Sequence, residues 1–240
     1  MIKKVEGIVV KEKNYGDTSK IIDVFTKEYG IIGMIAKGAK TMKSSLRSVT
    51  TKLSYGIFTI YYKEDKLSIL KEVEVLDSFN SIKKDIEKIS YSSFLIDLAT
   101  QVYKQNNNIY IYQLFISALK KINDGFDSLI ITNIVELKYL DYLGVMPDLT
   151  GCIVCGNTNV VTLSSDKGGY LCSNCRTNEP IISDKTMKLI RMYFYVDIDK
   201  IETLNISDQI KNEINNFLDS YYDRYTGLYL KSKEFLRKII

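Results

Sequence analysis

The sequence predicts an α+β multidomain protein in which a small closed β-barrel precedes an all-α domain that is interrupted by a four-cysteine segment. Three observations support this prediction. The first 80 residues contain short runs rich in β-branched and aromatic residues, which favour strands. From residue 81 onward, apolar residues recur at helical spacing. All four cysteines fall in two close pairs.

Five strands are expected in the predicted N-terminal domain, residues 1–80. They cover residues 5–10, 20–25, 31–36, 55–62 and 67–76. In the last of them, Leu67, Ile69, Val73 and Val75 share one parity, so they should line one face. Five short strands in about 80 residues are typical of a small barrel. The longest break between strands, residues 38–52, should be a loop.

The predicted second domain, residues 81–240, contains several helical patterns. We expect helices from 81 to about 102, from 112 to 123, from 128 to 143, from 185 to 195, from 208 to 221 and over 228–240. The only prolines, Pro147 and Pro180, bracket the cysteine segment, residues 148–180. No flexible linker separates the two domains, so we expect them to pack together.

The cysteines predict a metal site. Two Cys-x-x-Cys pairs stand 16 residues apart, which is the spacing of a zinc site. Four thiolates close a tetrahedron and leave no position for substrate, so we expect one structural Zn²⁺. The alternatives are two disulfides in a secreted protein or a redox dithiol. An apolar signal segment is missing at Met1, which disfavours secretion. The predicted ligands are Cys152, Cys155, Cys172 and Cys175.

Positive charge is concentrated near the N-terminus. Residues 1–80 carry 14 Lys/Arg and 10 Asp/Glu, whereas the remainder carries 19 of each. One run without any acid predicts contact with an anionic partner such as nucleic acid; its cations are Lys37, Lys40, Lys43, Arg47 and Lys52. A second cluster comprises Lys231, Lys233, Arg237 and Lys238. The alternative for the first cluster is a solvated loop that needs no partner. The alternative for the second is a C-terminal helix whose cations complement its own dipole.

The residue types favour binding over catalysis. The chain has no histidine, which rules out a Ser-His-Asp arrangement. It also lacks a Gly-x₄-Gly-Lys-Ser/Thr phosphate loop. We therefore expect no enzymatic activity. Free cysteines and the lack of a targeting sequence predict a cytoplasmic protein, and no apolar run is long enough to predict a membrane span.

Several motifs together resemble the RecO family of bacterial recombination mediators. They are Gly-Ile-Val-Val at 7–10, Asn-Tyr-Gly-Asp-Thr-Ser-Lys-Ile-Ile at 14–22, Phe-Thr-Lys-Glu-Tyr-Gly at 25–30, Ala-Lys-Gly-Ala-Lys at 36–40, Ser-Tyr-Gly at 54–56 and Lys-Ser-Lys-Glu-Phe-Leu at 231–236. The placement of the cysteine pairs fits as well. The resemblance covers the whole chain in register.

The resemblance implies an N-terminal OB-type barrel, a helical domain with a four-cysteine zinc site, and a nucleoid-associated role in DNA repair. It implies binding of single- and double-stranded DNA, annealing of complementary strands, and loading of RecA together with RecR and the C-terminal tail of single-strand-binding protein. Lys37 and Lys40 are its first DNA candidates. Lys233 stands where the family motif has arginine. The planar guanidinium, which can bind a phosphate through two hydrogen bonds, is therefore missing there.

Two other functions remain to be weighed. The helical domain of a zinc-containing scaffold would bind the acidic tail of a partner protein, and an apolar pocket rimmed by Lys/Arg would favour that function. A zinc-dependent hydrolase is disfavoured because four protein ligands leave the metal closed.

Overall fold

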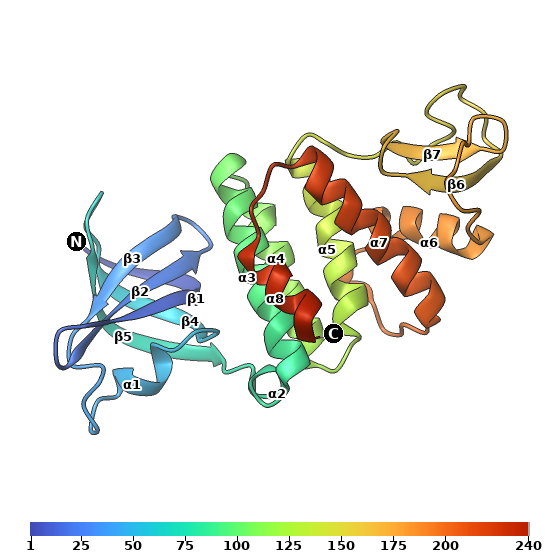
Figure 1. The fold of residues 1–240 in the computed structure, drawn as a ribbon. Helices are drawn as coiled ribbons and strands as arrows, with labels where there is room; N and C mark the ends of the chain where they lie inside the picture. The colour runs from blue at the N-terminus through green and yellow to red at the C-terminus, as the bar shows by residue number, and fades with distance from the viewer. Residues whose placement is uncertain (240) are drawn as a thin grey trace.

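The N-terminal part is a closed five-stranded barrel, as predicted (Figure 1). This computed structural model describes the backbone of residues 1–239 and the side chains of residues 1–236. The strands are β1 (Ile2–Tyr15), β2 (Ser19–Thr26), β3 (Gly30–Ala36), β4 (Tyr55–Tyr61) and β5 (Ser68–Asp77). Their order is β1-β2-β3-β5-β4. Antiparallel β1–β4 pairing and parallel β3–β5 pairing close the barrel, as in an OB-type fold.

The barrel interior is filled by apolar side chains that alternate along the strands. They include Val5, Val9, Ile22, Val24, Ile32, Met34, Phe58, Ile60 and Leu70. The predicted parity of β5 is wrong, because Leu67 and Val75 are 41% and 44% exposed. Thr59 pairs with Glu72 but Ile60 pairs with Leu70, so Lys71 is an extra residue of β5, and such a bulge changes which alternate residues face the interior. Leu70, before the bulge, and Val73, after it, therefore both pack in the barrel interior although their positions differ in parity.

The C-terminal part is helical, as predicted. Its elements are α2 (Asn80–Lys83), α3 (Ile86–Gln105), α4 (Ile109–Asn123), α5 (Ser128–Tyr142), α6 (Asp184–Tyr195), the short helix η1 (Ile198–Lys200), α7 (Asp208–Tyr225) and α8 (Lys231–Ile239). The single helix expected from residue 81 is instead two helices. The Asp85 carboxylate accepts hydrogen bonds from the Glu87 and Lys88 amides and begins α3, so Ile86 is 63% exposed rather than part of the apolar face.

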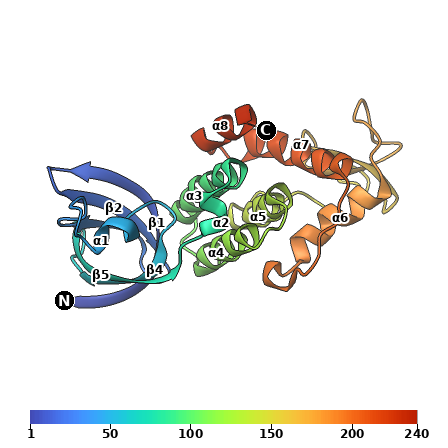
Figure 2. The ribbon, with the colours of Figure 1, turned by 90° about the horizontal axis from the view of Figure 1, so that it is seen from below.

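The two domains share one apolar core, as expected from the missing linker. Phe25 of β2 is fully buried, and its ring lies 4.9 Å from that of Tyr103 and 5.2 Å from that of Tyr112. The Tyr112 hydroxyl of α4 donates to Glu6 Oε1 of β1 at 3.5 Å. Figure 2 shows α3 and α4 stacked directly beside the barrel. This packing fixes the barrel against the helical bundle.

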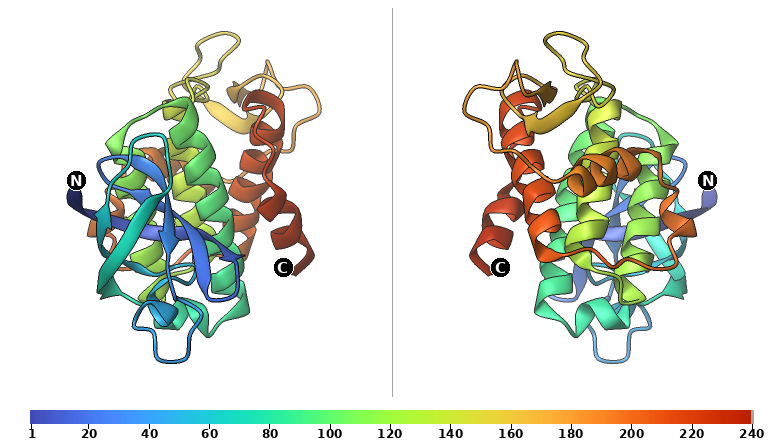
Figure 3. Two further views of the ribbon diagram at one scale, coloured as in Figure 1. Left: turned by 90° about the vertical axis from the view of Figure 1, so that its left-hand side faces the viewer. Right: turned by 90° about the vertical axis from the view of Figure 1, so that its right-hand side faces the viewer.

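The cysteine segment lies at the end of the molecule opposite the barrel (Figures 1 and 3). It contains a two-stranded sheet, β6 (Val160–Ser164) and β7 (Gly169–Cys172). α6 and α7 lie beside it. In the described residues, no helix has both the length and the hydropathy needed to cross a bilayer.

Candidate metal centre and nucleic-acid interface

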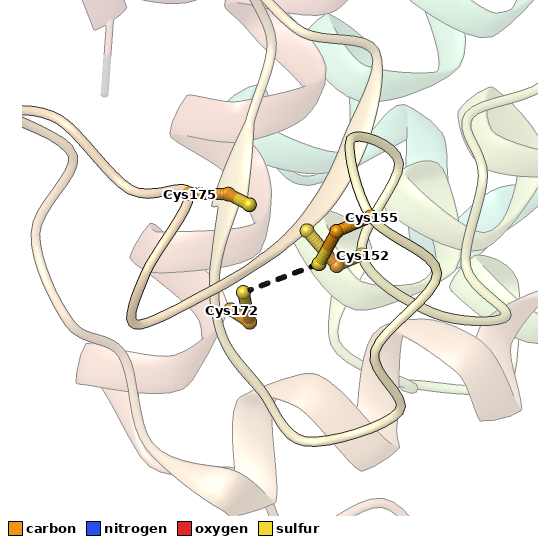
Figure 4. Close-up of side chains that lie close together, drawn as sticks. All are labelled: Cys152, Cys155, Cys172 and Cys175. Carbon is orange, nitrogen blue, oxygen red and sulfur yellow. Dashed lines mark hydrogen bonds between the residues drawn. The ribbon is translucent and has the colours of Figure 1, made fainter.

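Four cysteine sulfurs converge on one point (Figure 4). The Sγ atoms of Cys152, Cys155, Cys172 and Cys175 all lie within 4.8 Å of one another. The Cys155 and Cys172 sulfurs are 3.6 Å apart. A tetrahedron with metal–sulfur bonds of about 2.3 Å has sulfur–sulfur edges of about 3.8 Å. The four donors therefore fit one tetrahedral metal ion.

Tight backbone turns aim the sulfurs inward. In the first pair, Gly156 donates its amide to the Cys152 carbonyl at 2.7 Å and adopts φ +75°, which glycine tolerates without strain. In the second pair, the amides of Cys175 and Arg176 both donate to the Cys172 carbonyl. Each Cys-x-x-Cys pair is therefore a hydrogen-bonded turn at the edge of the β6–β7 sheet.

The electrostatics of the cluster favour a bound cation. Burial works to raise the pKa of the Cys152 thiol, but amide hydrogen bonds, including one from Cys172, outweigh it and lower that pKa to about 6. The crowded neighbouring sulfurs of Cys155 and Cys172 raise the pKa of Cys175. Several thiolates so close together repel one another, and a divalent cation removes that repulsion. The segment's own core cluster contains just Cys152, Leu171 and Cys172 as buried members, so a metal would supply much of its stability.

The predicted basic run lies in the connection between β3 and β4, which also holds the one-turn helix α1 (Leu46–Val49). Lys37, Lys43 and Arg47 are exposed, and Lys40 is half-buried. The Lys40 amide donates to the Thr18 carbonyl at 2.8 Å, and its Nζ donates to the Gly16 carbonyl at 3.3 Å. The connection is therefore anchored to the β1–β2 turn.

Charge on this connection is not neutralised from nearby. In the described part of the chain, no carboxylate forms an ion pair with any of these four cations. Residues 37–54 contain no acid. A surface like this attracts polyanions.

Lys52 has a different position from the rest of the run. It is half-buried, and its Nζ donates to Ser93 Oγ of α3 at 3.2 Å. Burial lowers the pKa of Lys52, and the charge of Asp97 partly opposes that effect. Lys52 thus faces the junction between the two domains rather than the exposed loop.

The C-terminal cluster is divided by the fold. Lys231 is exposed, with its Nζ 5.8 Å from the centre of the Tyr229 ring. Lys233, which was predicted to contact DNA, is 7% exposed, so its ammonium is not on the surface of this structure. Its Nζ pairs with Glu136 at 3.1 Å and with Asp219 at 2.6 Å. The side chains of Arg237 and Lys238 lie outside the described residues.

A groove lies where the barrel meets the helical domain, and its volume is about 640 Å³. Sequence reasoning missed it because its lining comes from distant parts of the chain. It brings the predicted cations Lys52 and Lys231 together with Lys11 of β1 and Lys104 of α3. Neither Lys11 nor Lys104 stands in a basic run, so the sequence carried no signal for them.

Two other cavities lie between helices. One, of about 310 Å³, is lined by Lys138 together with Asp141, Asp197 and Asp199. The other, of about 330 Å³, is lined by Glu136, Asp219 and Lys233. Carboxylates outnumber cations in both, so neither offers the cationic rim that an acidic partner tail needs.

Fold and site together define a class: an OB-type barrel with a basic connection, packed on a helical domain that carries four cysteines placed to hold a metal ion. Comparison with known families agrees. The family Recombination protein O N terminal matches residues 1–79, and Recombination protein O C terminal matches residues 83–234. The chain belongs to the RecO family.

Curated relatives match over nearly their whole length. The DNA repair protein RecO of Listeria monocytogenes serotype 4b (strain CLIP80459) is 34% identical over 243 residues, which cover 99% of this chain and 95% of the relative. The DNA repair protein RecO of Halalkalibacterium halodurans is 34% identical over 244 residues, 100% of this chain and 96% of the relative. That of Bacillus pumilus (strain SAFR-032) is also 34% identical, with coverage of 100% and 95%.

Proposed function

We propose that this protein is a DNA-binding recombination mediator that acts in DNA repair without catalysing covalent chemistry. It binds single- and double-stranded DNA and anneals complementary strands. With RecR and with single-strand-binding protein, contacted through that protein's C-terminal tail, it helps to load RecA. This proposal rests on membership of the RecO family, whose curated relatives are named DNA repair proteins. The site of action is the cytoplasm, in association with the nucleoid.

One observation carries the DNA-binding part of the proposal. A closed barrel presents a connection in which Lys37, Lys43 and Arg47 are exposed and no acid occurs. Barrels of this type bind single strands by combining cations that track the backbone with rings that stack on bases. Annealing also requires two polyanions to approach each other, and unpaired cations lower their repulsion.

In this proposal the two domains have different roles. Residues 1–80 form the DNA-binding domain, and residues 81–240 form the helical domain that receives partner proteins. The segment 148–180 holds one structural Zn²⁺ on Cys152, Cys155, Cys172 and Cys175. Zinc is the ion of choice because four thiolates in a tetrahedron suit its size and softness.

The test is a salt titration of binding to a labelled single-stranded oligonucleotide. Replacing Lys37 and Lys43 by Ala removes two exposed cations that make no ion pair. For single strands the logarithmic slope changes by about 0.7 for each phosphate contact, so the double variant should flatten it by about 1.4. The same variant should slow annealing of complementary oligonucleotides.

The control is the double replacement of Lys185 and Lys188 of α6 by Ala. Both side chains are exposed, and α6 lies far from the barrel (Figure 1). This variant loses the same charge, so it should leave the slope unchanged. Equal slopes for the loop variant and the wild type would remove the β3–β4 connection from the DNA interface.

A further inference from the structure

The groove between the barrel and the helical domain has the make-up of a binding site for a polyanion. Its four lysines come from four separate elements, and two acids, Asp23 and Asp97, lie beside them. Lys11, Lys104 and Lys231 are exposed, and in the described residues none of the three forms an ion pair. The groove therefore presents a net positive charge to an incoming ligand.

One of the two acids is already occupied in holding the groove together. Asp97 Oδ2 accepts a hydrogen bond from Ser232 Oγ at 2.7 Å, and Asp97 Oδ1 accepts one from Gln101 Nε2 at 2.7 Å. The bond from Ser232 ties the start of α8 to α3, whereas Gln101 belongs to α3 itself. Lys231, the first residue of α8, is thereby held among the residues that line the groove.

The floor of the groove is apolar. It is lined by Val10, Ile31 and Ile96, whereas the lysines stand around it. Tyr229 lies next to Lys231, whose Nζ is 5.8 Å from the centre of its ring. It is 66% exposed, and its carbonyl accepts a hydrogen bond from Gln101 at 3.0 Å. Cations around an apolar floor, with an exposed ring beside them, match the phosphates, sugars and bases of a single strand.

The groove meets the end of the basic connection at Lys52. Lys52 ends the basic run and also lines the groove. Its amide donates to Glu12 of β1 at 3.1 Å, and its Nζ reaches Ser93 of α3. Burial lowers the pKa of Lys52, and a phosphate bound beside it would favour the charged form of the lysine.

We propose that this groove is a second DNA subsite, which takes a single-stranded segment leaving the basic connection. Lys11, Lys52, Lys104 and Lys231 contact phosphates there, and the apolar floor and Tyr229 contact bases. A volume of about 640 Å³ is that of a small-ligand site, and an unpaired base can reach its apolar floor whereas the paired and stacked bases of a duplex cannot. The subsite therefore distinguishes single-stranded from double-stranded DNA. This inference rests on the DNA-binding function proposed above.

The experiment compares matched double variants of the full chain. Lys11→Ala/Lys104→Ala removes one exposed cation from each wall of the groove, and Lys185→Ala/Lys188→Ala is the charge-matched control. At 0.1 M salt each lost phosphate contact costs about 5-fold in single-strand affinity, so the groove variant should lose about 25-fold, and its salt slope should flatten by about 1.4. Duplex affinity should stay within about twofold of the wild type, by the same counting.

The ring of Tyr229, beside Lys231, gives a second readout, which the loss of a charge alone would not change. Tyr229→Ala should weaken single-strand binding without altering the salt slope, because a stacking contact releases no counterions. An oligonucleotide carrying 4-thiothymidine should, on irradiation, form cross-links that map to the lining segments of β3 and α3.

The outcomes separate the two proposals. If the wild type binds no DNA, the proposed function fails. If it binds DNA and the groove variant behaves like the control, the groove is not a DNA subsite although the function stands. Equal losses for single strands and duplexes would also overturn the inference. So would an acidic peptide that binds the groove and fails to compete with the oligonucleotide.

Discussion

Replacing Phe25 by Ala should uncouple the barrel from the helical bundle. Phe25 is fully buried, and its ring contacts those of Tyr103, Tyr112 and Phe115 at centroid distances of 4.9, 5.2 and 6.0 Å. Truncating a buried phenylalanine costs about 3–5 kcal/mol in the free energy of unfolding. At about 2–4 °C for each kcal/mol in a protein of this size, the melting temperature should fall by roughly 6–20 °C.

The assay is urea denaturation followed by far-UV circular dichroism and by tyrosine fluorescence, since the chain has 18 tyrosines and no tryptophan. Phe25→Leu keeps most of the volume and should cost less than about 1.5 kcal/mol. Val75→Ala, on the exposed face of β5, should change stability by less than about 0.5 kcal/mol. A loss below about 1 kcal/mol for Phe25→Ala would refute the conclusion that the two domains share one core.

Three further predictions concern the helical domain. Chelation should release about one zinc ion per chain and make residues 148–180 sensitive to protease while the barrel stays resistant; protection that survives metal removal would contradict this. Lys233→Ala should lower the free energy of unfolding by about 3 kcal/mol, because it breaks a buried ion pair, and it should leave DNA affinity within about twofold, since the ammonium is buried. Hydrogen bonds to Asp208 and Asp127 raise the pKa of Lys211, and its bond to Asp208 lowers the pKa of that carboxyl. The stability difference between wild type and Lys211→Met should therefore be full between about pH 4 and pH 10.4, the unfolded-state values. It should shrink as the pH falls below or rises above that window, as measured by urea midpoints.

The elements that sequence patterns predicted well are those with strong local signals. The five strands follow from β-branched runs, and the convergence of the four cysteines follows from the spacing of Cys152, Cys155, Cys172 and Cys175. Both signals are local in the sequence. Alternating side chains favour a strand, and a Cys-x-x-Cys pair followed by Gly156 favours a tight turn.

The features that local patterns could not give depend on contacts between distant residues. Lysine is rarely buried, so Lys233 was expected on the surface. It is buried because α8 packs on α3 and brings it to Glu136. The bulge in β5 likewise arises from pairing with β4, and Asp85 interrupts a pattern that apolar spacing alone would continue.

The groove shows that a run of charges along the sequence does not identify the cations that share a surface. Lys52 was grouped with the loop, yet its Nζ reaches α3. Lys104 belongs to no run, yet it lines the same groove. A polyanion responds to the cations that share a surface, whatever their separation in sequence. If the loop and groove variants act on separate phosphates of one strand, their losses in single-strand affinity should multiply in the combined variant. Losses that fail to multiply would mean that the two surfaces share contacts or change shape together.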